Sequence, residues 1–493
     1  MDVHISLVGR RNLSGEIYRQ LRTAILEGRL RPGDLLPPTR ELARSLSVSR
    51  TTVTVAYDRL TGEGFVTSRV GAGTWVSEHL RAPRGQGRSG REGAIRPRPL
   101  WDALVVPTPF VPPARFDFRT GLPDSTLFPY EAWRRLIARQ FRPDAAGRGV
   151  YGDPAGHRGL REAIVRHLGV ARGVQASADE VVITNGTQQA LDLLARALLA
   201  PGDRVAVEDP GYPPPRWLFE SLGARVAGVP VDREGLVVDA IPRHVRCVYV
   251  TPSHQYPLGM PMSLARRLAL LAWAERHDAV IIEDDYDSEF RFRGQPIEPL
   301  QSLDTAGRVA YVGSFSKTLL PTLRLGFVIA PPSLCKAVRK AKFVADWHSP
   351  LQVQAALARF IDSGGFARHL RRMGAVYRRR HELVTGILAR DFGGRLEVIP
   401  SAAGLHVGVI APGATADRAR DLVSRSARLG VAVQELSLFG IAPPARAGLV
   451  LGYGAIATGQ IAEGLRRLRR CFEEMEAADR SSMPAREEAL HPA

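Results

Sequence analysis

The stretch Gly313-Ser314-Phe315-Ser316-Lys317-Thr318-Leu319-Leu320-Pro321 contains one of only four lysines in a chain of 493 residues. The other three, Lys336, Lys340 and Lys342, share one helix-like segment and resemble ordinary surface charge. The chain has 67 lysine and arginine residues in total, and all except these four are arginine. Such a composition suggests that lysine is retained at positions where arginine cannot perform the same role. A desolvated lysine amine can condense with a carbonyl group to form a Schiff base, and a guanidinium cannot. We therefore predict that Lys317 is a Schiff-base residue rather than a solvated loop lysine.

On both sides of this stretch, from Phe116 onward, short β-branched runs alternate with helical patterns. Helices are expected at 188–199 and 263–277. The predicted strands are 181–184, 205–207, 248–250, 280–282, 309–312 and 327–329. This alternation predicts an α/β domain around a mostly parallel sheet, spanning 116 to about 340. A smaller α+β portion is expected over about 341–475, followed by a disordered tail at 476–493.

The neighbours of Lys317 suggest pyridoxal phosphate (PLP), which needs a Schiff-base lysine, an acid at its ring nitrogen, a phosphate cradle and a ring clamp. Asp284 and Tyr286 follow a predicted strand, near the sheet-edge crevice where α/β proteins bind ligands. Asp284 would face the ring nitrogen, and the Tyr286 hydroxyl would donate to the ring oxygen. Between 184 and 191 a strand turns through glycine into a helix, whose N-terminus attracts phosphate. The residues predicted for the cradle are Gly186, Thr187, Gln188, Ser314, Ser316 and Arg324, and Tyr212 is predicted to stack on the ring.

Residues 1–80 predict a different unit, a winged helix-turn-helix with three helices and a β-hairpin. Residues 1–115 hold 18 arginines against 10 acidic residues, and such positive charge suggests a polyanionic partner. In a helix-turn-helix the third helix enters the DNA major groove with its N-terminus near the bases. The predicted DNA contacts are Arg40, Ser49, Arg50, Thr51 and Thr52, with Gly71 and Gly73 at the tip of the wing. The alternative is a three-helix protein-interaction module. Residues 81–115 are expected to form a basic, flexible linker.

Three blocks of the N-terminal unit carry a family resemblance. They are Gly28-x-Leu30-x-Pro32-Gly33-Asp34-x-Leu36-Pro37, Arg40-Glu41-Leu42-Ala43 and Val48-Ser49-Arg50-x-Thr52-Val53. Over residues 14–76 the chain resembles the GntR family of bacterial repressors. The resemblance implies binding to double-stranded promoter DNA.

From about Phe116 to Cys471, the order of the motifs resembles the fold-type I aminotransferases. Gly121-Leu122-Pro123-Asp124 and Tyr151-Gly152-Asp153-Pro154-x-Gly156 match two further blocks of that family. The resemblance implies a homodimer, in which Tyr151 reaches the cofactor phosphate of the partner subunit. A GntR-like head joined to an aminotransferase-like body resembles the MocR (GabR-like) class of regulators.

Two departures from the enzyme pattern bear on function. Tyr256-Pro257-Leu258-Gly259 stands where catalytic relatives have Asn-Pro-Thr-Gly, so His254 or Gln255 is expected to take the place of the asparagine. Val450 occupies the expected slot of the arginine that holds a substrate carboxylate, and Arg446 is the nearest alternative. The sequence therefore favours a regulator that senses PLP, or an amine or amino acid, over an efficient enzyme. The alternatives are an active aminotransferase with a DNA-binding appendage and a cofactor-free dimerisation module.

The remaining sequence features argue against several other classes of protein. No apolar run is long enough to cross a bilayer, and the first residues lack a signal-peptide pattern. The three cysteines, Cys247, Cys335 and Cys471, are widely spaced, so neither a disulfide framework nor a metal site is indicated. We expect a cytoplasmic protein without a membrane partner.

Overall fold

The structure is a computed structural model that describes residues 5–7, 12–69, 72–78, 96, 98–104, 106, 112–142, 150–292, 298–442 and 446–482. The chain divides into two compact units, a head unit over Met1–Arg98 and a body unit over Pro99–Ala493. Most of the predicted linker at 81–115 lies outside the described residues. One helical turn, α4 (Leu100–Ala103), falls within it and was not expected in a flexible segment.

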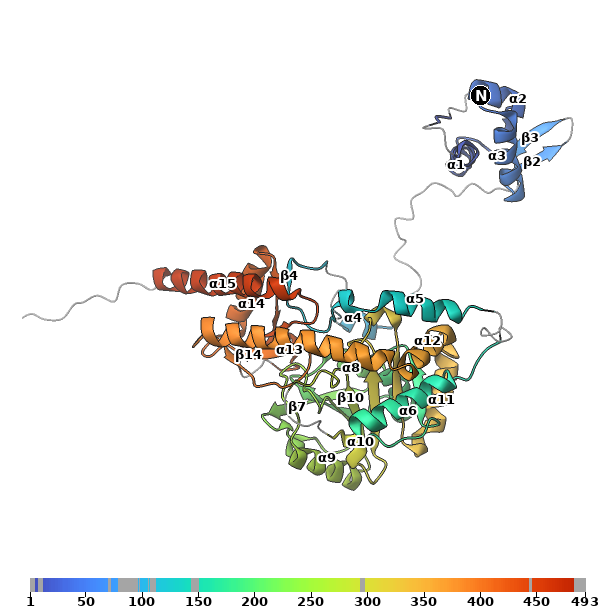
Figure 1. Ribbon diagram of the computed structural model, residues 1–493. Helices are drawn as coiled ribbons and strands as arrows, with labels where there is room; N and C mark the ends of the chain where they lie inside the picture. Colours follow the sequence, from blue (N-terminus) through green and yellow to red (C-terminus); the bar gives the residue numbers. More distant parts are fainter. Residues whose placement is uncertain are drawn as a thin grey trace, which may run out of the picture. The chain divides into compact units, whose positions relative to one another are not determined.

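The head unit is a winged helix-turn-helix, as predicted (Figure 1). Its elements are α1 (Leu13–Leu26), β1 (Leu35–Leu36), α2 (Thr39–Ser45), α3 (Arg50–Gly62), β2 (Val66–Arg69) and β3 (Gly73–Val76). Apolar residues at helical spacing bury one face of each helix in a shared core, with Ile17, Leu42 and Val53 at 3% exposure or less. Ser49 caps α3, because its side chain accepts a hydrogen bond from the Thr52 amide at 3.1 Å. The short strand β1, which pairs with β3, was not predicted.

The body unit is built on an eight-stranded sheet with the order β5-β12-β11-β10-β9-β6-β7-β8. Its strands are β5 (Val181–Thr184), β6 (Arg204–Asp209), β7 (Arg225–Asp232), β8 (Gly235–Leu236), β9 (Val245–Val250), β10 (Val280–Asp285), β11 (Val309–Ser314) and β12 (Gly326–Ile329). Strands β6, β7, β9, β10 and β11 pair in parallel, whereas β12 is antiparallel to both of its neighbours. The prediction of a mostly parallel sheet is confirmed. Because β5 and β11 both oppose β12, all six of these parallel strands end at the same edge of the sheet.

Helices cover both faces of this sheet, because successive strand residues point to opposite sides. Along β10, Ile282 packs in one core cluster with α7, α8 and α11, whereas Ile281 packs in another with α9 and α10. The covering helices are α7 (Thr187–Leu198), α8 (Pro213–Ser221), α9 (Leu264–Arg276), α10 (Leu300–Leu303) and α11 (Pro332–Asp346). Three more, α5 (Tyr130–Arg139), α6 (Arg158–Arg172) and α12 (Leu351–Asp362), pack near the β5 end of the sheet.

The last helices and strands of the body unit form a smaller α+β portion (Figure 1). Its buried apolar side chains form a core of their own. It contains α13 (Gly365–Asp391), β13 (Glu397–Val398), β14 (His406–Ile410), α14 (Ala416–Arg428), β15 (Val431–Ala432), β16 (Gln434–Glu435), β17 (Gly448–Gly452) and α15 (Ile461–Ser482). The segment before the large sheet joins it, since β4 (Phe116–Asp117) pairs with β15.

Two predicted boundaries of the body unit are wrong. The smaller portion does not begin near 341, because α11 runs through that position and α12 packs with β5, β11 and β12. Helix α13 joins the two portions, because Phe366 packs in the core with β5, β11 and β12, whereas Met373 packs in the core of the smaller portion. The tail is not disordered from 476, since α15 continues to Ser482, and residues 483–493 lie outside the described part. Within the described residues, no helix combines the length and apolar character needed to cross a membrane.

Candidate cofactor site and DNA-contacting surface

A cavity of about 350 Å³ lies at the carboxyl ends of the parallel strands in the body unit. The structure brings most of the predicted cofactor residues together there. Those that line it are Thr187, Gln188, Tyr212, Asp284, Tyr286, Ser314, Ser316, Lys317 and Arg324. These residues come from segments between 187 and 324 of the chain, and the shared strand edge explains why they meet.

Lys317 follows β11, and its amine faces the cavity. Nζ donates a hydrogen bond to the carbonyl oxygen of Gly121 at 2.6 Å. Burial lowers the pKa of Lys317, and the nearby carboxylates Asp287 and Asp284 oppose this effect. A lysine with a lowered pKa exposes its nitrogen lone pair more often, which suits attack on a carbonyl group.

Lys342 is a lysine of the opposite kind. It is fully buried, so the prediction that it is a surface lysine is wrong. Its Nζ donates to Gln189, Asp346 and Ser349 at 2.8–2.9 Å and does not line the cavity. All of its donors are therefore engaged, with α7 through Gln189, with α11 itself through Asp346 and with the segment after α11 through Ser349.

Asp284 offers a buried carboxylate with one oxygen free. Oδ2 accepts a hydrogen bond from the Tyr249 hydroxyl at 2.7 Å, whereas Oδ1 has no hydrogen-bond partner. Burial raises the pKa of Asp284 to about 7. An unpaired buried acceptor is costly, and a protonated pyridine nitrogen would satisfy it. This fits the role predicted for Asp284.

The predicted phosphate cradle forms at the N-terminus of α7. Gly186 caps this helix with φ +78° and no side-chain hydrogen bond, which leaves backbone amides for a ligand. A Cβ at Gly186 would lie 2.9 Å from Nη2 of Arg324, which itself donates to the Asn185 carbonyl at 2.6 Å. The Ser316 amide donates to Ser314 Oγ at 3.1 Å. Free amides, hydroxyls and a guanidinium around a position without a side chain suit a phosphate.

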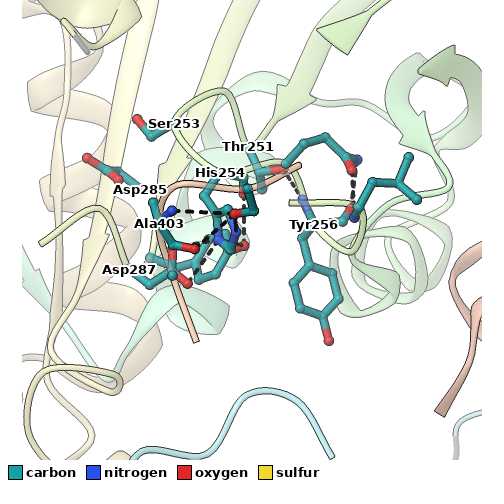
Figure 2. A network of polar contacts seen from close by, with 12 residues as sticks. Thr251, Ser253, His254, Tyr256, Asp285, Asp287 and Ala403 are labelled. Carbon is teal, nitrogen blue, oxygen red and sulfur yellow. Dashed lines mark hydrogen bonds and ion pairs between the residues drawn. The ribbon is translucent and has the colours of Figure 1, made fainter. Parts of the chain in front are cut away.

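A polar network lies beside the cavity (Figure 2). The Tyr286 hydroxyl donates to the His254 carbonyl oxygen at 2.8 Å, and His254 Nδ1 lies 3.1 Å from both Asp287 oxygens. Nε2 of His254 is 3.2 Å from Ser401 Oγ. His254, Asp287 and His406 each offer a potential metal-ligand atom, and these atoms lie within 4.8 Å of one another.

Neither candidate for the missing asparagine reaches the cavity. His254 is engaged in the network, and Gln255 donates to the carbonyls of Pro210 and Tyr256 at 2.9 and 2.8 Å. The prediction that one of them substitutes is therefore wrong for this structure. Tyr256, which occupies the asparagine position itself, lines the cavity and bonds through its hydroxyl to Thr120.

Two other predicted residues lie away from the cavity. Arg446 precedes the Gly448 end of β17, whereas His406 of the cavity pairs with Gly452 at the other end. Arg446 lines a separate hollow, so its prediction as a carboxylate ligand is wrong. Tyr151 is 74% exposed and its ring contacts that of Trp347, with centroids 4.3 Å apart. It does not line the cavity of its own chain.

Sequence reasoning missed about half of the cavity wall. The missed residues are Thr120, Gly121, Tyr249, Thr251, Tyr256, Asp287, Pro321, Leu405, His406 and Gln434. Asp287 directly follows Tyr286, so it lies in a segment that the sequence had already predicted to be part of the site. By contrast, His406 and Gln434 belong to the smaller portion, and only the packing of the two portions brings them here.

In the head unit, Ser49, Arg50 and Thr51 are exposed at the N-terminus of α3, and Arg40 is exposed on α2. The fourth predicted residue there, Thr52, is partly buried, with Oγ1 2.7 Å from Ser49 Oγ. Gly73 begins β3 with φ +127°, and Gly71 lies outside the described residues. The exposed end of α3 is thus free to meet a ligand.

The two units correspond to two known families. Residues 13–76 match the bacterial regulatory proteins of the gntR family, and residues 120–447 match aminotransferase class I and II. A winged helix joined to an aminotransferase-like body defines a class of one-chain transcriptional regulators.

Full-length relatives share this arrangement. The probable rhizopine catabolism regulatory protein MocR of Rhizobium meliloti is 38% identical, over 94% of each chain. The regulator TauR of Rhodobacter capsulatus is 37% identical, over 94% of this chain and 97% of its own. The chain belongs to the MocR-type regulators of the GntR family.

The body unit also resembles solved aminotransferases. The kynurenine aminotransferase of Pyrococcus horikoshii aligns with a TM-score of 0.68 and 28% identity, covering 73% of this chain and 91% of its own. This likeness confirms the predicted aminotransferase-like fold, which is characteristic of PLP-dependent proteins.

Proposed function

We propose that this regulator binds PLP in the body-unit cavity, contacts promoter DNA through α3 and the wing, and couples the two events. The observation that carries the proposal is one cavity that holds the Lys317 amine, the unpaired Oδ1 of Asp284 and the cradle at Gly186. Each of these groups lacks a complete set of partners in the protein and matches a different part of PLP.

When bound, PLP supplies an aldehyde that condenses with amines and a ring that withdraws electrons. Lys317 provides the amine that holds it covalently. Asp284 keeps a proton at the ring nitrogen, and the Tyr212 ring lies in the cavity wall where it can contact the cofactor face. The phosphate would be held by the backbone amides at the N-terminus of α7, by Ser314 and Ser316, and by Arg324.

The DNA-binding part of the proposal rests on α3. Its N-terminus exposes Arg50, Ser49 and Thr51, which suit guanine edges and phosphates, and Arg40 lies on the preceding helix. Filter binding of the full chain to its own promoter region should weaken steeply with salt. Affinity that is independent of salt would contradict this role.

A homodimer is part of the proposal. Val150, Tyr151, Val344 and Trp347 are between 45% and 80% exposed, and Tyr151 packs on Trp347. Exposed apolar side chains grouped in this way are typical of interaction surfaces. Tyr151 is proposed to reach the phosphate of the partner subunit's cofactor. Analytical ultracentrifugation of the wild-type chain and of Trp347→Asp tests the dimer, which the substitution should dissociate.

Transamination is a second candidate activity, favoured by the retention of Lys317 and Asp284 in the cavity. Against it, Val450 is fully buried in an apolar cluster with Tyr256 and Phe439, where the enzymes place an arginine. Amino-group transfer at ordinary enzyme rates, unaffected by deletion of residues 1–115, would establish the enzyme. A PLP-dependent change in promoter affinity without turnover would establish the sensor.

A further inference from the structure

The wall of the cavity away from the phosphate cradle has a distinct chemistry. Asp287, His406, Gln434, Thr120 and Tyr256 line it. All five lie outside the segments that supply the cradle. This part of the cavity, which we call the effector wall, is where a ligand that binds beside the Lys317-held cofactor would lie. The inference below rests on the proposed function.

The effector wall has no cationic side chain available to bind a carboxylate of the ligand. Among the described residues that line the cavity, the cationic side chains are Lys317 and Arg324. Arg324 lies against Gly186 and Asn185 at the cradle, and Lys317 holds the cofactor. Asp287 places a carboxylate on the wall, with 1% of its side chain exposed. A free carboxylate on the ligand would therefore meet negative charge without a counter-ion.

His406 adds an unused acceptor. The residue is 2% exposed, and its Nε2 has no hydrogen-bond partner. The ring has a backbone hydrogen-bond partner at Pro257, and a neutral ring that donates there through Nδ1 leaves a lone pair on Nε2. Burial lowers the pKa of His406 well below its usual value, so the ring stays neutral. A buried lone pair of this kind requires a donor, and no described protein group supplies one.

The other polar groups of the wall are mostly engaged with one another. The Tyr256 hydroxyl bonds to Thr120 Oγ1, which donates to Gln434 Oε1 at 2.9 Å. The Thr120 amide donates to the same oxygen at 2.9 Å. Gln434 therefore keeps only its neutral amide donor for a ligand. The wall as a whole offers acceptors and negative charge, with a single neutral donor.

We propose that the effector is an amine that carries hydroxyl groups or further ammonium groups and no carboxylate, and that Nε2 of His406 accepts one of its hydrogen bonds. Its amine would come near Lys317 and Asp287, and its other donors would face His406. Free α-amino acids would be discriminated against, since their carboxylate would displace water without gaining a partner.

Two probes that differ at one group test this class of ligand. In 2-amino-1,3-propanediol a hydroxymethyl group replaces the carboxylate of L-serine. The full chain is loaded with PLP, loading is confirmed by visible absorbance, and calorimetry gives the Kd of each probe with a chelator present. The chelator prevents a cation at His254, Asp287 and His406 from contributing. We expect the diol to bind at least about tenfold more tightly than serine, the effect of one well-made hydrogen bond or one avoided charge clash.

Two variants of His406 test the acceptor. His406→Phe keeps a ring and removes the lone pair, so the diol should lose about tenfold in affinity. His406→Gln keeps an acceptor oxygen and should recover most of it. Loaded wild-type protein that binds serine as tightly as the diol, or binds neither, overturns this inference alone. If PLP addition gives no visible band, the proposed function itself fails.

Discussion

Replacing Asp284 by asparagine should change two properties of the protein in opposite directions. The carboxylate is 3% exposed, and burial raises its pKa from the usual 3.8 to about 7. Between these two values the folded protein binds more protons than the unfolded chain, so the buried charge destabilises the fold increasingly as the pH rises. The difference corresponds to about 4 kcal/mol above pH 7, where the cost is complete.

Asparagine removes that charge but keeps an acceptor for the Tyr249 hydroxyl. Its amide nitrogen would then occupy the unpaired position of Oδ1, which costs about 1–3 kcal/mol. The net expectation for the empty protein at pH 8 is a gain of about 1–3 kcal/mol in unfolding free energy. PLP affinity should fall at least tenfold, because a charge-assisted hydrogen bond of about 1.5–3 kcal/mol is lost.

Thermal or urea unfolding of the empty protein at pH 5 and pH 8, with PLP titrations followed by absorbance, measures both effects. The stabilisation should be larger at pH 8 than at pH 5. Asp285→Asn is a matched control on the same strand, since Asp285 pairs with Arg172 at 3.0 Å and should lose stability instead. An Asp284→Asn protein that is less stable when empty at pH 8 and binds PLP normally would refute this reasoning.

Three further outcomes are expected. Arg50→Gln should weaken promoter binding and reduce the slope of log affinity against log salt by at most about 1; an unchanged affinity in filter binding would remove Arg50 from the interface. Gly186→Ala should weaken PLP binding by about tenfold in an absorbance titration, because φ is +78° and the new Cβ would crowd Arg324; equal affinity would show that the cradle lies elsewhere. Lys342→Met should lower the unfolding free energy by about 3 kcal/mol and leave the PLP band intact, whereas loss of the band at full folding would mean that Lys342 supports the cofactor.

The sequence was most informative where function depends on one short segment. Three features can each be recognised from a short stretch of sequence: the strand-to-helix turn at Gly186, the acid at the end of β10 and the lysine after β11. Parallel strands then bring such segments to one edge, which is why nine predicted residues line one cavity.

The features that could not be predicted from the sequence depend on contacts between distant segments of the chain. Nothing near His406 or Gln434 indicates that the smaller portion closes the cavity. Arg446 was chosen by distance along the chain, but the register of β17 against β14 places it at the far end of the strand. Lys342 looked like surface charge because its partners, Gln189 and Ser349, come from other segments. Helix α12 likewise packs on the large sheet through contacts that its own periodicity does not specify.

The central claim is that PLP on Lys317 controls the affinity of this regulator for DNA. The most direct test compares wild-type protein with Lys317→Ala, recording visible absorbance and promoter affinity with and without added PLP. We predict a PLP-dependent band and a PLP-dependent change in promoter affinity for wild type, and neither for the variant, which should still bind DNA. The same band in both proteins, or a wild-type affinity that PLP leaves unchanged, would contradict the claim.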